Sequence, residues 1–90
     1  MNKESRKRVK EVIKRMEEVQ SLLSDIQSDL EEIGEEEREK YDNIPESLRQ
    51  GESGQSMGDA ADAFESAASE AEDAISTVER LIDYIIEYSE

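Results

Sequence analysis

Apolar residues recur along the first half of this chain at alternating spacings of three and four, the pattern of a helix that buries one stripe. Polar and charged residues separate them, so a helix is predicted over about residues 4–41, capped by Asn2 or Ser5. Gly34 could end this helix, but the good helix formers after it favour continuation. The stripe consists of Val9, Val12, Met16, Val19, Leu23, Ile26, Leu30 and Ile33.

The second half of the chain predicts another amphipathic helix, over about residues 57–88. Ser56 and Asp59 are spaced like a capping box, with Asp in place of the usual Glu. The stripe of this helix is small at one end and large at the other. Its members are Ala61, Phe64, Ala68, Ala71, Ile75, Val78, Ile82 and Ile85.

The two stripes match each other when the helices lie antiparallel. Val9 then pairs with Ile85, Leu30 with Phe64, and one register satisfies eight layers. In three layers a large residue of the first helix meets an alanine, as a close-packed core requires. The sequence therefore predicts an all-α, coiled-coil-like antiparallel helical hairpin that forms one domain.

A second apolar stripe on the later helix has no partner in this pairing. It consists of Ala60, Ala67, Ala74, Leu81 and Tyr88. A homodimer that forms a four-helix bundle is the favoured explanation, because symmetric homo-oligomers are common. A groove for a helix of another protein is the alternative.

Residues 42–55 hold the single proline and two of the four glycines, so a turn with a short helix is predicted there. The segment after Gly51 is expected to be a flexible polar link. Residues of the turn are predicted to fold back and plug the open end of the hairpin. They are Tyr41, Asn43, Ile44, Pro45 and Leu48.

The distribution of charge indicates which partners the chain can bind. The net charge is −14, yet residues 1–16 alone carry seven Lys/Arg and two Glu. An acidic chain is repelled by nucleic acid and by anionic membranes over most of its surface, so direct binding to either is not expected. A basic protein surface is the expected partner. No apolar run resembles a membrane span or a signal peptide, so a cytoplasmic location is expected.

Residue types exclude most catalytic chemistry. The chain has no His and no Cys, which removes the commonest general base, the thiolate nucleophile and the ligands of most transition-metal sites. The acidic run after Asp29 lacks the ligand spacing of an EF-hand. Neither an enzyme, a metal site nor a cofactor is expected.

Two function classes stay open. In the first, a rigid acidic hairpin occupies a cationic groove of a host protein, because helical carboxylates lie about 4.5 to 10 Å apart along the axis and so bracket the phosphate spacing of nucleic acid. In the second, the chain is a structural or assembly coiled coil and its charges only keep it soluble. The candidate binding residues of the first class are Glu31, Glu32, Glu35, Glu36, Glu39, Asp59, Asp62, Glu65, Glu72 and Asp73.

The turn also carries a resemblance. The segment "YDNIPESL", between an acidic helix and an Ala/Glu-rich helix, resembles a pattern in small, mostly uncharacterised proteins of bacteriophages and prophages. The resemblance covers residues from about 30 to 85 and rests on this one motif. It implies a phage-related origin, and hence a bacterial host, but no particular activity, and it carries over no functional residue. If the first function class applies to a phage protein, its target is expected to be a host protein such as a defence nuclease.

Overall fold

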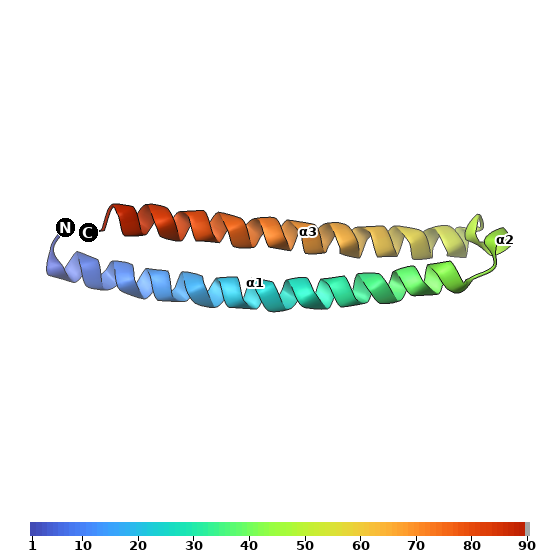
Figure 1. Cartoon of the computed structure of the whole chain (residues 1–90), viewed down its shortest axis with the longest axis horizontal. Helices are drawn as coiled ribbons and strands as arrows, with labels where there is room; N and C mark the ends of the chain where they lie inside the picture. Colours follow the sequence, from blue (N-terminus) through green and yellow to red (C-terminus); the bar gives the residue numbers. More distant parts are fainter. Residues whose placement is uncertain (90) are drawn as a thin grey trace.

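A helical hairpin is the architecture of the computed structural model, which describes residues 1–89 (Figure 1). Helix α1 spans Lys3–Asn43, the short helix α2 spans Glu46–Arg49, and helix α3 spans Glu52–Glu87. Helices α1 and α3 run antiparallel along a rod of 68 × 16 × 14 Å, with the two chain ends opposite α2. The predicted all-α hairpin is confirmed.

The ends of α1 follow from local chemistry. The side chain of Asn2 accepts a hydrogen bond of 2.8 Å from the backbone N–H of Ser5, so Asn2 is the cap and Ser5 lies inside the helix. The helix continues through Gly34 to Asn43, two residues beyond the predicted end. It stops there because Ile44 precedes Pro45, whose ring disfavours a helical conformation in the residue before it; Ile44 is extended, with φ −81° and ψ 149°.

The start of α3 corrects the sequence prediction. The helix begins at Glu52 with Gly51 as its cap, so the segment expected to be a flexible link is its first turn, and Ser56 and Asp59 lie inside the helix rather than capping it. A close backbone approach explains this. A Cβ on Gly54 would overlap the carbonyl oxygen of Leu48 and lie 2.6 Å from the Cα of Arg49. Gly54 thus lets α2 pack directly on α3.

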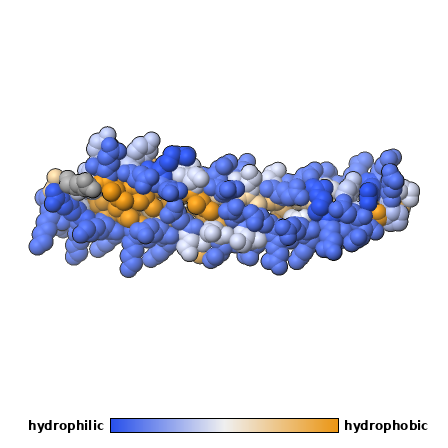
Figure 2. Space-filling view, viewed as in Figure 1, coloured by the Kyte–Doolittle hydropathy of each residue, from blue (hydrophilic) through white to orange (hydrophobic). Residues whose placement is uncertain are grey.

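The predicted stripe of α3 lines the contact between α1 and α3, which is named here the seam. Ala61, Ala68, Ala71 and Ile82 are buried, and the other four members of the stripe are half-buried. No large side chain of the described residues is fully buried. Apolar surface therefore shows between the helices, in a band that is broadest toward the chain ends (Figure 2).

The seam of α1 differs from the prediction in every second position. Val9, Met16, Leu23 and Leu30 are half-buried against α3 as predicted. The other four predicted members are exposed to between 38% and 48%: Val12, Val19, Ile26 and Ile33. Their places in the seam are taken by Ile13, Gln20, Gln27 and Gly34.

The rotation of α1 also changes which residue of α1 meets Phe64. Gly34 is buried against Phe64, where the predicted register placed Leu30, one helical turn earlier. A Cβ on Gly34 would lie 3.5 Å from the Cβ of Phe64, so the small residue allows a close approach of the helix axes. The predicted set of eight apolar layers is therefore wrong on the α1 side. Physically, the polar residues Gln20 and Gln27 and the small residue Gly34 take seam positions while larger apolar side chains stay exposed, which the apolar pattern of the sequence does not indicate.

Candidate functional site

Acidic side chains dominate the half of the rod that carries α2. Residues 23–75 hold 17 Asp/Glu and three Lys/Arg, a formal charge of −14, which equals the net charge of the whole chain. Residues 1–22 together with 76–90 hold eight Asp/Glu and eight Lys/Arg and are neutral. Because the hairpin places Gln20 of α1 beside Ile75 of α3, these two sets form two separate halves of the rod, named here the acidic half and the neutral half.

All ten predicted binding carboxylates are exposed, five on α1 and five on α3. The structure therefore presents them on one half of the molecule but does not gather them into a pocket. Their exposed positions, combined with a rise of about 1.5 Å per residue, spread them along the rod. They can contact an extended basic surface, whereas they cannot together enclose a small ligand.

Arg38 ties two of these carboxylates together across the seam. Its guanidinium donates hydrogen bonds to Glu65 (3.2 Å) and to Asp62 (2.5 Å), so α1 and α3 are joined by ion pairs on one flank. These hydrogen bonds, that of Glu65 foremost, raise the pKa of Arg38 above its already high ordinary value. Asp62 and Glu65 are consequently partly neutralised, and the other eight carboxylates carry most of the charge available to a partner.

An aromatic ring organises the end of the acidic half. The guanidinium groups of Arg38 and Arg49 both lie over the Tyr41 ring, 5.9 and 5.5 Å from its centroid. Gly58 of α3 makes room for this ring, because a Cβ there would lie 3.2 Å from it. Arg49 also donates a 2.7 Å hydrogen bond to the carbonyl oxygen of Asp42, which ties α2 to the last turn of α1.

The predicted plug is therefore only partly present. Tyr41 and Ile44 are half-buried, whereas Asn43 and Pro45 are exposed and Leu48 is 59% exposed, so Leu48 does not fold over the open end as predicted. The end is closed instead by the Tyr41 ring and by the backbone of α2 against α3. Sequence reasoning missed Gly54 and Gly58 here. The available signal was their spacing of three and four before Ala61, which continues the α3 stripe toward the turn.

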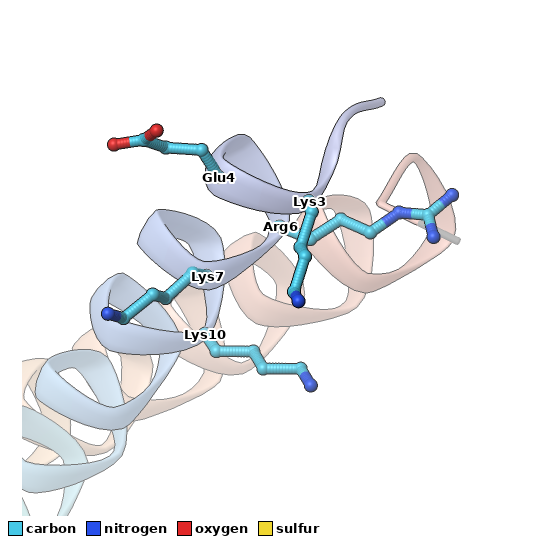
Figure 3. Close-up of a pocket in the computed structure, with 5 residues that line it drawn as sticks. All are labelled: Lys3, Glu4, Arg6, Lys7 and Lys10. Carbon is cyan, nitrogen blue, oxygen red and sulfur yellow. The ribbon is translucent and has the colours of Figure 1, made fainter.

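The opposite end of the rod is basic on its α1 side. Lys3, Arg6, Lys7 and Lys10 project from the first turns of α1 around a shallow hollow, and Glu4 points away from them (Figure 3). These residues come from a single helix. The hollow is thus the space between long side chains, and it contains no group able to activate a substrate.

An exposed apolar flank joins the predicted unpartnered stripe of α3 to a row of α1 residues that the sequence prediction had placed in the seam. Arg38 and Glu65 form an ion pair across the seam, and each follows an apolar residue by five positions: Ile33 precedes Arg38, and Ala60 precedes Glu65. Five residues rotate a helix by one full turn plus about 140°. Both residues therefore lie on the flank opposite the ion pair. Repetition every seven residues extends the flank along the rod. This apolar flank consists of Val12, Val19, Ile26 and Ile33 of α1 and the predicted stripe Ala60, Ala67, Ala74, Leu81 and Tyr88 of α3.

The rest of the chain covers the α3 part of this flank only in part. Ala60, Ala67 and Ala74 are half-buried, whereas Leu81 is 45% and Tyr88 is 78% exposed. Large apolar side chains thus gather on this flank toward the neutral half, and small ones lie toward the acidic half on α3.

Metal-ligand geometry and membrane-spanning length are both missing from residues 1–89. No three Asp or Glu side chains in this range come together in a way that could hold a metal ion. Neither long helix contains, within the same range, an apolar stretch that could cross a membrane. Comparison with protein-family models, with curated proteins and with solved structures gave no match for this chain.

Proposed function

We propose that this chain is a non-enzymatic protein-binding module that presents its acidic half to a basic surface of another protein, of the kind that otherwise holds nucleic acid. The observation that carries the proposal is the separation of charge along the rod. The entire net charge of −14 lies in residues 23–75, while the other half is neutral. Charge kept only for solubility has no reason to be confined to one half.

Rigidity supports the same proposal. The Arg38 ion pairs and the contacts of Arg38 and Arg49 with the Tyr41 ring join α1, α2 and α3 at the acidic end. Carboxylates on helices fixed in this way lose little backbone entropy when they bind. The phage-like turn motif supports a target in a bacterial host, such as a nuclease that defends it.

Capture of proteins from a bacterial lysate tests the proposal with two matched variants. The first neutralises five outward carboxylates of the acidic half that Arg38 does not bind: Glu32→Gln, Glu35→Gln, Glu39→Gln, Asp59→Asn and Asp73→Asn. The second makes the same change in net charge in the neutral half: Glu11→Gln, Glu17→Gln, Glu18→Gln, Glu79→Gln and Asp83→Asn. All ten positions are exposed, so both variants should keep the helicity of the unmodified chain.

We expect the unmodified chain and the second variant to retain a nucleic-acid-binding protein that salt elutes, and the first variant to lose it. The association rate should fall most, because charge complementarity chiefly steers encounter. The captured protein should also bind less nucleic acid in the presence of the unmodified chain. Equal capture by the two variants, with equal salt dependence, would show that the position of the charge does not matter and would refute the proposal.

A structural assembly module is the second candidate function, and the exposed apolar flank favours it. Solvent-exposed apolar surface of this length is typical of helices that pack against a further helix. Binding through this flank is expected to respond weakly to salt, which separates it from binding through the acidic half.

A further inference from the structure

The apolar flank is large enough for a stable interface. It runs along a rod 68 Å long and 16 Å wide, so the face of the molecule that carries it has a footprint of roughly 1,000 Å², compared with about 800 Å² buried per partner in a stable protein complex. Four β-branched residues of α1, all more than a third exposed, lie on it. An interface of this kind requires a partner that is apolar along its whole length.

A row of residues beside the flank shows which partner fits. A second row of α1 residues, also spaced seven apart, lies next to the apolar row. Its first four members each stand four residues before Val12, Val19, Ile26 or Ile33, and the fifth continues the spacing. This outer row consists of Arg8, Arg15, Leu22, Asp29 and Glu36. All five are exposed, and none of its four charged members makes an ion pair within residues 1–89.

The outer row is complementary to its own reverse. Reversal about Leu22 exchanges Arg15 with Asp29 and Arg8 with Glu36, so every charge meets its opposite. The apolar row behaves in the same way, since reversal about nearly the same point exchanges Val19 with Ile26 and Val12 with Ile33. A surface that matches its own reverse is the requirement for a two-fold symmetric interface between identical chains.

The α3 part of the flank is reversible too. Reversal about Ala74 brings Ala67 to Leu81 and Ala60 to Tyr88, so small residues of one copy meet large residues of the other. Charge at the scale of the whole rod gives the same orientation. A parallel pair would stack one acidic half of charge −14 on another, whereas an antiparallel pair sets each acidic half against a neutral half.

We propose that a second copy of this chain covers the apolar flank, antiparallel to the first, with the two α1 helices packed about a two-fold axis near Leu22. The product is a four-helix bundle in which Arg8 and Arg15 of each copy pair with Glu36 and Asp29 of the other. The acidic turns then lie at opposite ends of the bundle. This arrangement does not depend on the proposed function, because a dimer of this kind can form whether or not the acidic half binds a partner.

Charge reversal in two complementary variants tests the pairing. One variant carries Arg8→Glu and Arg15→Glu, and the other carries Asp29→Arg and Glu36→Arg. Each variant alone sets like charges against each other at both ends of the outer row. In sedimentation experiments, the unmodified chain should therefore form a dimer at micromolar concentration, and each variant should associate at least tenfold more weakly. An equimolar mixture of the two should dimerise again, because the heterodimer restores four opposite-charge pairs.

Cross-linking tests the orientation, since the chain has no Cys of its own. Leu22→Cys lies at the proposed axis and should form a disulfide-linked dimer on oxidation. The matched variant Gln50→Cys, also exposed, lies at the turn and should not, because the two turns are at opposite ends of the bundle. Three results would overturn the proposal: a helical monomer for the unmodified chain, no dimer from the mixed variants, or cross-linking through Gln50→Cys in place of Leu22→Cys.

Discussion

Gly34 and Gly54 are both buried in helices, yet replacing each by alanine should change stability in opposite directions. A glycine inside a helix costs about 1 kcal/mol relative to alanine, because its backbone loses more freedom on folding. At Gly34 the added methyl group would meet Phe64 and Glu65 at 3.5 Å, which is ordinary van der Waals contact. Gly34→Ala should therefore stabilise the fold by about 0.5–1 kcal/mol.

At Gly54 the same methyl group has no space. It would overlap the carbonyl oxygen of Leu48 and lie 2.6 and 2.7 Å from the Cα and carbonyl oxygen of Arg49, which are backbone atoms that cannot rotate away. Overpacking of this kind costs about 1–3 kcal/mol and outweighs the helix propensity gained. Gly54→Ala should destabilise the fold by about 1–2 kcal/mol, or release α2 from α3.

Urea unfolding followed by far-UV circular dichroism measures both changes, at one fixed protein concentration because the stability of an associating chain depends on it. The two variants are matched controls for each other, since each makes the same chemical change inside a helix. A Gly54→Ala variant as stable as Gly34→Ala would refute the backbone contact between α2 and α3. A loss of stability in Gly34→Ala would refute the approach of α1 and α3 at Phe64.

The other predictions concern side chains of the seam and of the turn. Ile82→Ala should lower the free energy of unfolding in urea by about 2–4 kcal/mol, because Ile82 is buried. Ile86→Ala should lower it by less than half as much, because Ile86 is 44% exposed. Equal losses of stability would contradict the seam of α3. Tyr41→Phe should keep stability because the ring that contacts Arg38 and Arg49 remains, whereas Tyr41→Ala should cost about 1–2 kcal/mol and raise amide exchange in α2. No change in either variant would show that the ring does not close this end.

The seam of α3 was predictable because an apolar residue occupies every one of its positions, so the sequence pattern and the packing agree. The seam of α1 is not apolar throughout: Gln20, Gln27 and Gly34 lie there, whereas the apolar pattern favours Val19, Ile26 and Ile33. Only contact with α3 decides between Val12 and Ile13, or between Ile33 and Gly34. The sequence pattern could not weigh the close approach that a small residue such as Gly34 allows, and for that reason it did not place Gly34 against Phe64.

The turn was mispredicted through an ordinary rule applied out of context. Glycines between polar residues usually mark a flexible link, so the segment after Gly51 was assigned to one. In the structure Gly54 allows close packing and does not supply backbone flexibility, since the backbone of α2 lies where a side chain at this position would be. The positions of the ten carboxylates were simpler to predict, because charged residues opposite an apolar stripe lie in solvent whichever edge of the stripe forms the seam.

The hairpin topology has a consequence for how the chain folds. The contact of Tyr41 with Gly58 closes a loop of only 17 residues, whereas contacts of Val9 with α3 near Ile85 close one of about 76. Short loops close at lower entropic cost, so the helices should zip from the turn toward the chain ends. This first-formed part is also the acidic half, where the two helices repel each other. Screening by added salt should therefore accelerate folding more than it slows unfolding, which stopped-flow measurements in urea can separate.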